Sequence, residues 1–402
     1  MLELLFLLLP IAALYGWYMG QRSAKKDQET VSNKFSREYV TGLNFLLSNQ
    51  QEKAVDLFLS MLQKQESENH IASESQFEAE LTLGNLFRSR GEVDRALRIH
   101  QTLVNSPHYS FDQKLLAKQQ LAKDFMVAGF YDRAENYYIS LVDEPEFAKY
   151  SLSQLAVIYQ KTREWKKAIN VAEKRLRIEP DTDKIPLSHF YCEYAQGVKF
   201  DDKAAFIESL NKALEYYPQS TRASIMLGDF YLEEGEYLRA LSYFEQILVQ
   251  DPDYISEVLG RIKQSYMALE DLNGYELFLI RANRVKHNSS VDIALTEFIE
   301  EKDGINAAHS KLYQQLSTYP NLITFHRFIR YQADFAEEGN GKESLVLLHN
   351  MVGNQIKRSF QYRCLNCGYQ SYRLMWQCPS CNQWEKIKPV QSIEGLFNKE
   401  RI

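Results

Sequence analysis

A repeated pattern of small and aromatic residues constrains the fold of this chain more than any other feature of its sequence. The clearest copy is MLGDFYLEEGEYLRALSYFEQILVQDP, residues 226–252. In this copy the residues at the fixed offsets are Gly228, Tyr231, Gly235, Ala240, Phe244 and Pro252. Small side chains at 228 and 240 let two antiparallel helices approach closely, and the proline ends the second helix. Each copy therefore predicts two helices joined by a short turn.

The same frame fits four upstream segments. Their matching residues are Gly42, Phe45, Ala54 and Phe58; Gly84, Phe87, Gly91 and Ala96; Ala122, Phe125, Gly129, Ala134 and Tyr138; and Ala156, Tyr159, Ala168 and Ala172. The third and fourth of these copies are 34 residues apart. That period and these offsets are typical of tetratricopeptide repeats, which stack side by side into a superhelix.

Copies further along the chain match the pattern only in part. Residues 190–218, 254–284 and 291–320 keep some of the offsets, and residues 323–350 predict a last pair of helices interrupted by EEGNG at 337–341. We therefore expect an all-α tetratricopeptide superhelix over residues 36–355. It should contain about eight or nine helix pairs, with little or no strand before residue 360.

Four of the five cysteines form two C-x-x-C pairs near the end of the chain, Cys364 with Cys367 and Cys378 with Cys381. Each pair can bend into a knuckle that presents both sulfurs to one cation, and two facing knuckles make a closed tetrahedral site. The alternatives are disulfides or a redox dithiol. All four metal ligands would be thiolates, so the site has no open coordination position and is expected to be structural. The fifth cysteine, Cys192, is expected to be a small buried residue.

The residues around the cysteine pairs suit a small metal-stabilised ribbon over residues 356–402. Gly368 and Asn382 follow the two pairs, and both residue types tolerate a left-handed backbone. The strings C-x-x-C-G-Y and C-P-x-C resemble rubredoxin knuckles, so one iron or one zinc ion is chemically suitable. Five aromatic residues are expected to pack around the sulfurs: Tyr362, Tyr369, Tyr372, Trp376 and Trp384.

The N-terminal segment predicts a membrane anchor. Residues 2–20, LELLFLLLPIAALYGWYMG, are nearly all apolar, and nineteen helical residues span close to the roughly 30 Å of a bilayer core. Arg22, Lys25 and Lys26 follow the run, whereas a signal peptide carries its positive charge before it. Positive charge stays on the cytoplasmic side. We expect a single-pass anchor at 1–20, a basic linker at 21–35 and a cytoplasmic body.

Charge and motif content limit the class of function. The formal net charge is −6; from residue 354 onward eight Lys and Arg oppose three Asp and Glu, or +5, which leaves −11 for the rest. This acidic body argues against a nucleic-acid-binding protein. The sequence has no Walker loop, no H-E-x-x-H and no G-x-S-x-G. The histidines are scattered, and His100 stands at a packing position of its repeat. We therefore predict no catalytic residues and a protein-binding function for the repeats.

The order of anchor, tetratricopeptide body and terminal C-x-x-C-G…C-P-x-C ribbon resembles the lipopolysaccharide assembly protein B family of Gram-negative bacteria, over the entire chain. The resemblance implies an inner-membrane adaptor whose ribbon packs against the repeat groove. It implies that the adaptor helps the membrane protease FtsH degrade the lipid A deacetylase LpxC, limits lipopolysaccharide synthesis and contacts other lipopolysaccharide assembly proteins. By residue, only the four metal ligands carry over: Cys364, Cys367, Cys378 and Cys381.

Three other functions remain open from the residues alone. One is a membrane-anchored tetratricopeptide scaffold of another pathway, which the repeats would serve equally well. The second is an electron carrier that uses an iron site, although the ten-residue spacer between the cysteine pairs is short for rubredoxin. The third is a nucleic-acid-binding ribbon, because basic zinc ribbons often contact phosphates.

Overall fold

The structure is a computed structural model that describes residues 15, 17–20, 37–68 and 74–390. The expected linker at 21–35 and most of the expected anchor at 1–20 lie outside these residues; residues 15 and 17–20 are helical. Within the described part of the chain, no helix is long and apolar enough to cross a membrane.

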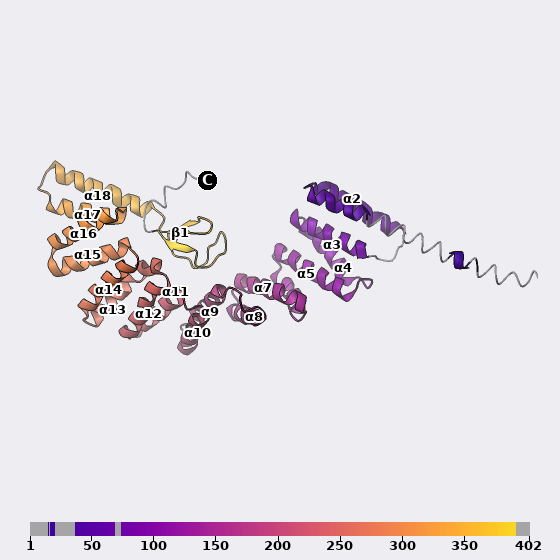
Figure 1. Ribbon diagram of the computed structural model, residues 1–402, viewed down its shortest axis with the longest axis horizontal. Coiled ribbons are helices and arrows are strands. Elements are labelled where there is room, and N and C mark those ends of the chain that lie inside the picture. The colour runs from indigo at the N-terminus through magenta and orange to yellow at the C-terminus, as the bar shows by residue number, and fades with distance from the viewer. Residues whose placement is uncertain (1–14, 16, 21–36, 69–73, 391–402) are drawn as a thin grey trace, which may run out of the picture. The chain divides into compact units, whose positions relative to one another are not determined.

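The described chain is mostly helical, and its helices follow one another in the antiparallel manner of helix–turn–helix repeats (Figure 1). After a first helix at residues 37–47, the helices are α2 (Gln51–Glu68), α3 (Glu74–Ser89), α4 (Val93–Asn105), α5 (Phe111–Ala128), α6 (Tyr131–Leu141), α7 (Pro145–Thr162), α8 (Trp165–Ile178), α9 (Ile185–Val198), α10 (Lys203–Tyr216), α11 (Thr221–Glu233), α12 (Tyr237–Gln250), the 3₁₀ helix η1 (Pro252–Glu257), α13 (Leu259–Ala268), α14 (Leu272–Val285), α15 (Ser289–Asp303), α16 (Ile305–Thr318), α17 (Leu322–Phe335) and α18 (Asn340–Arg358). The mostly helical tetratricopeptide fold expected from the sequence is confirmed.

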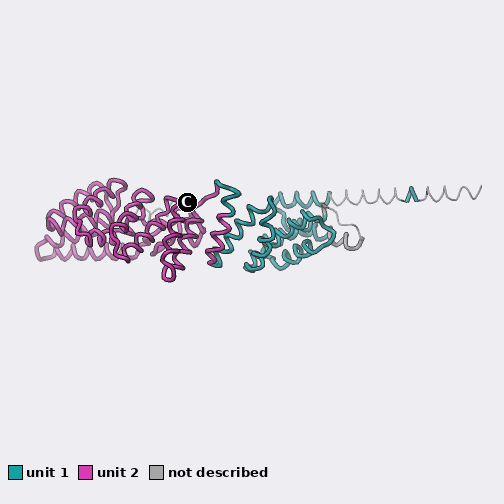
Figure 2. The backbone as a smooth tube through the Cα atoms, turned by 90° about the horizontal axis from the view of Figure 1, so that it is seen from below, with its two compact units in different colours: residues 1–162, 174–180 teal, residues 163–173, 181–402 magenta. Residues whose placement is uncertain are grey.

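The chain divides into two compact units (Figure 2). Unit 1 comprises residues 1–162 and 174–180, and unit 2 comprises residues 163–173 and 181–402. The boundary crosses α8, whose first part belongs to unit 2 and whose last part belongs to unit 1.

The packing inside a repeat explains the pattern of small residues. A Cβ atom added at Gly228 of α11 would lie 2.4 Å from the ring of Phe244 of α12, and one added at Gly84 of α3 would lie 2.4 Å from the His100 ring of α4. Both rings are completely buried. The glycine is therefore required because a ring from the second helix fills the space where its side chain would be.

Unit 1 also contains a buried polar cluster between neighbouring repeats. The Asp124 carboxylate on α5 lies 2.5 Å from His100 Nδ1 and 2.9 Å from Arg88 Nη1 on α3. Asp124 and His100 are both fully buried. His100 therefore fills the space that Phe244 fills in the later repeat, and it also contacts Asp124 of the next repeat. The sequence placed His100 correctly in the packing but did not indicate its partner.

Unit 2 ends in a three-stranded antiparallel sheet of order β2-β1-β3. Its strands are β1 (Tyr362–Cys364), β2 (Gln370–Ser371) and β3 (Ile387–Pro389). Figure 1 shows this ribbon, in yellow, on the inner side of the curve made by the helices of unit 2. Leu374 and Trp376 of the ribbon pack against the hydrophobic core formed by α11 to α15. This packing on the repeats agrees with what the family resemblance implies.

Candidate metal centre and its docking surface

The first cysteine pair lies in a tight turn that begins at the end of β1. The amide of Cys364 donates to the Tyr369 carbonyl oxygen at 2.7 Å, and the amide of Gly368 donates back to the Cys364 carbonyl oxygen at 3.0 Å. Gly368 has a φ of +77°, the left-handed conformation expected from the sequence. The turn brings Cys367 to the same side as Cys364.

The second cysteine pair lies in a turn with the same hydrogen bonds. The amide of Cys378 donates to the Gln383 carbonyl oxygen at 2.9 Å, and the amide of Asn382 donates to the Cys378 carbonyl oxygen at 2.8 Å. Asn382 has a φ of +56°, which a side chain of this type tolerates. The two turns are thus a matched pair of knuckles, with Gly368 and Asn382 in equivalent positions.

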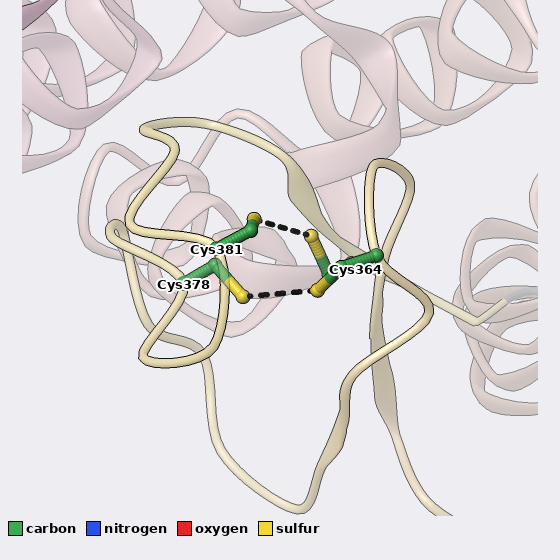
Figure 3. A group of neighbouring side chains, drawn as sticks. Cys364, Cys378 and Cys381 are labelled. Carbon is green, nitrogen blue, oxygen red and sulfur yellow. Dashed lines mark hydrogen bonds between the residues drawn. The ribbon is translucent and has the colours of Figure 1, made fainter. Parts of the chain in front are cut away.

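The four sulfur atoms meet between the knuckles and lie within 4.8 Å of one another. Figure 3 shows Cys364 facing Cys378 and Cys381 across this space. The Sγ atoms of Cys364 and Cys381 lie 3.8 Å apart, and those of Cys367 and Cys378 lie 3.5 Å apart. Sulfurs about 2.3 Å from a zinc ion form a tetrahedron with edges of about 3.8 Å. All five cysteines of the chain are free of disulfides. The four cysteines therefore form a zinc-ribbon-like metal site, which the geometry fits better than disulfide pairing.

The electrostatic surroundings of the thiols also suit a cation. A hydrogen bond from the Asn366 side chain, with a second from the Gln383 amide, lowers the pKa of Cys381 to about 6. The Tyr369 amide lowers the pKa of Cys367. Burial instead raises the pKa of Cys378 to about 12. A bound cation offsets that burial cost, because it stabilises the thiolate directly.

The aromatic residues of the ribbon do not all surround the sulfurs, and this part of the sequence expectation is wrong. Tyr362 packs with Cys364 and Cys378, but Tyr369 and Tyr372 are exposed. The two tryptophans face the repeats. The reason is that the ribbon is docked on the helices, where apolar rings are removed from water.

The tryptophans form the apolar part of the docking surface. The Trp384 ring stacks on His189 of α9, with 4.5 Å between ring centroids and 12° between planes. It also meets the edge of Phe190 at 6.3 Å. Trp376 lies 5.1 Å from the ring of Tyr254 in η1. Both tryptophans therefore anchor the ribbon to unit 2.

Strand β3 adds polar contacts with η1 and the residue before it. The Tyr254 hydroxyl donates to the Ile387 carbonyl oxygen at 2.9 Å. Lys388 forms an ion pair with Asp251 and lies 4.2 Å above the Tyr254 ring. Tyr254 is 1% exposed, so its hydrogen bond to Ile387 is shielded from water, whereas the side chains of Lys388 and Asp251 stay partly exposed. They set the position of β3 on the repeats.

Two further pairs join the ribbon to the helices. The Tyr362 hydroxyl donates to both carboxylate oxygens of Glu257 at 3.0 Å, and His189 Nε2 lies 3.1 Å from Glu385 Oε1. Burial raises the pKa of Glu257, against the opposing effect of the Tyr362 hydrogen bond. Burial lowers the pKa of His189, although Glu385 acts in the opposite direction. These partners are 105 and 196 residues apart in the chain, so no local sequence pattern could indicate them.

Cys192 and two histidines of the last repeat lie outside the metal site. Cys192 is fully buried in α9, and burial raises the pKa of its thiol to about 12. A thiol with this pKa does not react readily at neutral pH. His326 and His349 stack on each other between α17 and α18 with 3.9 Å between centroids.

Known protein families match both the repeats and the metal ribbon of this chain. The rubredoxin metal binding domain family matches residues 362–389, and tetratricopeptide repeat families match residues 151–185 and 207–255. Lipopolysaccharide assembly protein B of Haemophilus influenzae is 62% identical over 98% of this chain and 100% of its own length. The protein of that name in Escherichia coli is 45% identical over 98% of this chain and 100% of its own. A solved tetratricopeptide repeat protein from Parabacteroides merdae is 14% identical over 66% of this chain and 98% of that chain, with a TM-score of 0.35.

Proposed function

The chain belongs to the lipopolysaccharide assembly protein B family, and we propose that it is a non-enzymatic adaptor that limits lipopolysaccharide synthesis at the bacterial inner membrane. The finer proposal is that it promotes degradation of the deacetylase LpxC by the membrane protease FtsH and contacts other lipopolysaccharide assembly proteins. The observation that carries the proposal is the end-to-end similarity to relatives named for lipopolysaccharide assembly.

The structure supports an adaptor because it offers binding surfaces and a rigid connection between them. Stacked helix pairs provide an extended face for protein segments. The ribbon is held on unit 2 by Trp376, Trp384 and Tyr362. A partner that touches both the ribbon and the helices of unit 2 would therefore meet one preformed surface.

The proposed cofactor is one zinc or iron ion held by Cys364, Cys367, Cys378 and Cys381. Four thiolates close the coordination sphere, so the ion would have no open position for a substrate and would act as a cross-link. Its role is to hold the two knuckles together and thereby to keep β1 and β3 in place against unit 2.

The proposed location rests on the sequence of the first 35 residues. The apolar run at 1–20 would be a single-pass inner-membrane anchor, and the basic linker at 21–35 would keep the repeats, 36–355, and the metal domain, 356–402, in the cytoplasm. Confinement to the membrane raises the effective concentration of the adaptor for membrane-bound partners.

The half-life of the deacetylase after translation is blocked tests this function. A deletion strain should retain the deacetylase longer and overproduce lipopolysaccharide. Full-length protein should restore rapid degradation, whereas protein without residues 1–20, or with Cys364→Ser and Cys367→Ser, should not. Cys192→Ala is the matched control, because it removes the one cysteine that does not belong to the four-cysteine group.

Each outcome distinguishes the proposal from its main alternative. An unchanged half-life in the deletion strain would reject the deacetylase pathway and favour a scaffold of another pathway. Full rescue by the protein without residues 1–20 would reject the role of the anchor. Full rescue by the double cysteine variant would reject the role of the metal ribbon.

A further inference from the structure

A cavity of about 240 Å³ lies in unit 2 where the ribbon meets the last repeats. Its wall combines the end of η1, the first residues of α15 and α17, the end of α18 and the residues that flank β1 and β3. Its apolar side chains are Leu322, Ile323, Ile356, Phe360 and Val390. The cavity is separate from the cysteine site and from the tryptophan contacts described above.

The polar side of the cavity contains two buried groups without partners. Asn288 is 2% exposed, and its Oδ1 caps α15 by accepting from the Ser290 amide at 2.9 Å. Among the described residues, neither Asn288 Nδ2 nor the buried Ser256 Oγ has a hydrogen-bond partner. A buried polar group without a partner is destabilising, because it has lost its hydrogen bonds to water. Both residues line the cavity, so an acceptor placed there would remove this cost.

The remaining charges narrow the chemical class of the ligand. α15 and α17 both begin at the cavity, at Ser289 and Leu322, and the amides of a first helical turn attract acceptor atoms. Glu257 is also among the lining residues, and its acidic side chain disfavours a phosphate or another anion. A peptide carbonyl is an acceptor without net charge. An extended peptide with an apolar side chain satisfies both the donors and the apolar wall.

The size of the cavity agrees with a short peptide segment. Its volume is below the roughly 300–1,000 Å³ of pockets that enclose drug-sized molecules. A segment of this chain is available at the cavity, because Val390 lines it and residues 391–402, QSIEGLFNKERI, follow directly. That segment carries four apolar side chains, Ile393, Leu396, Phe397 and Ile402, and Leu396 and Phe397 are adjacent.

We propose that this cavity is a peptide-binding site and that its occupant is the chain's own segment 391–402. The covalent connection gives the segment an effective concentration on the order of millimolar, which a separate partner must exceed. An apolar side chain of the segment would contact the wall around Leu322 and Ile356, and a backbone carbonyl would accept from Asn288 Nδ2. The segment would then bridge the ribbon and the last two repeats. This inference is independent of the proposed role in lipopolysaccharide synthesis.

Competition with a labelled peptide tests the proposal. The probe is a fluorescein-labelled peptide of sequence QSIEGLFNKERI, and its binding to the full-length chain is followed by fluorescence anisotropy. The unaltered protein should bind the probe weakly, because its own segment competes. The full-length double variant Leu396→Ser, Phe397→Ser should bind it at least ten times more tightly. Lys399→Ser with Glu400→Ser, which changes the same segment without removing its apolar residues, is the matched control and should behave like the unaltered protein.

A third change links the binding to this cavity. Asn288→Asp keeps an oxygen that caps α15 and replaces the free Nδ2 donor by an acceptor. Added to the Leu396→Ser, Phe397→Ser variant, it should weaken probe binding at least tenfold, while circular dichroism and metal content stay unchanged. Equal probe affinity for the unaltered protein and the double variant would overturn the assignment of the occupant. Equal affinity with and without Asn288→Asp, or no binding to any variant, would overturn the site.

Discussion

Removing the Trp384 ring should loosen the ribbon from unit 2. The ring is 7% exposed, stacks on His189 and meets the edge of Phe190. Replacing a buried tryptophan by alanine costs about 3–5 kcal/mol, of which a stacked pair accounts for about 0.5–1.5 kcal/mol. We therefore expect Trp384→Ala to lower the free energy of local opening around β1 and β3 by about 3 kcal/mol, or about 100-fold in the opening equilibrium.

Hydrogen exchange of the amides in β1, β3 and α9 measures this opening, and metal content measured on the same sample separates undocking from loss of the ion. Tyr369→Ala is the matched control, since Tyr369 is a ribbon aromatic that is 38% exposed and away from the helices. It should change the exchange by less than about threefold, as exposed substitutions usually cost within about 0.5 kcal/mol. Unchanged exchange in Trp384→Ala, with the metal retained, would show that the stacking on His189 does not hold the ribbon.

Three further changes test the metal site, the pH dependence of docking and the packing inside a repeat. Cys378→Ser should lose the ion and unfold the ribbon, because metal binding supplies on the order of 10 kcal/mol of the ribbon's folding free energy. Elemental analysis should show no metal, while the helical circular dichroism should mostly persist; retained metal would contradict the four-cysteine site. Since burial lowers the pKa of His189, its neutral form stabilises docking fully above its unfolded pKa of about 6.5, and this stability should be lost as the pH falls below that value; tryptophan fluorescence between pH 8 and 5 should report the loss, and His189→Phe should remove the part of the transition due to this ring. Gly228→Ala should destabilise unit 2 by about 1–3 kcal/mol through the clash with Phe244, and the better helix propensity of alanine should offset up to about 1 kcal/mol of this loss. Gly260→Ala is the control and should not lower the urea midpoint, because its added Cβ meets nothing within 4 Å. Equal urea midpoints for the two variants would contradict the packing argument.

The sequence predicted the helical repeats because their signals are local. Gly228 and Phe244 are sixteen residues apart and belong to one helix–turn–helix unit, so their spacing alone indicates that they pack together. The knuckles were predicted for the same reason, because Gly368 and Asn382 directly follow the cysteines that they help to turn. The sequence also placed His100 in the core by its position in the repeat, and Cys192 because a free cysteine is usually a small buried residue.

The sequence did not indicate the contacts between distant residues. His100 was assigned to packing, but Asp124, whose carboxylate lies 2.5 Å from the His100 Nδ1, comes from the next repeat. The aromatic residues of the ribbon were expected around the sulfurs, because the sequence shows only that they are near the cysteines. The structure turns Trp376 and Trp384 toward η1 and α9 instead.

The sequence by itself therefore determined the repeat fold and the four candidate ligands, which depend on residues within one repeat or one cysteine ribbon. It also determined the family resemblance, which depends on the order of these parts along the chain. Only the tertiary structure decided where the ribbon docks. The contacts of Trp384 with His189 and of Tyr362 with Glu257 join segments separated by more than 100 residues. Such contacts form because folding brings two apolar surfaces together and buries them from water. Which residue packs against a buried ring depends on the fit of the two surfaces, so no regular spacing in the sequence indicates it.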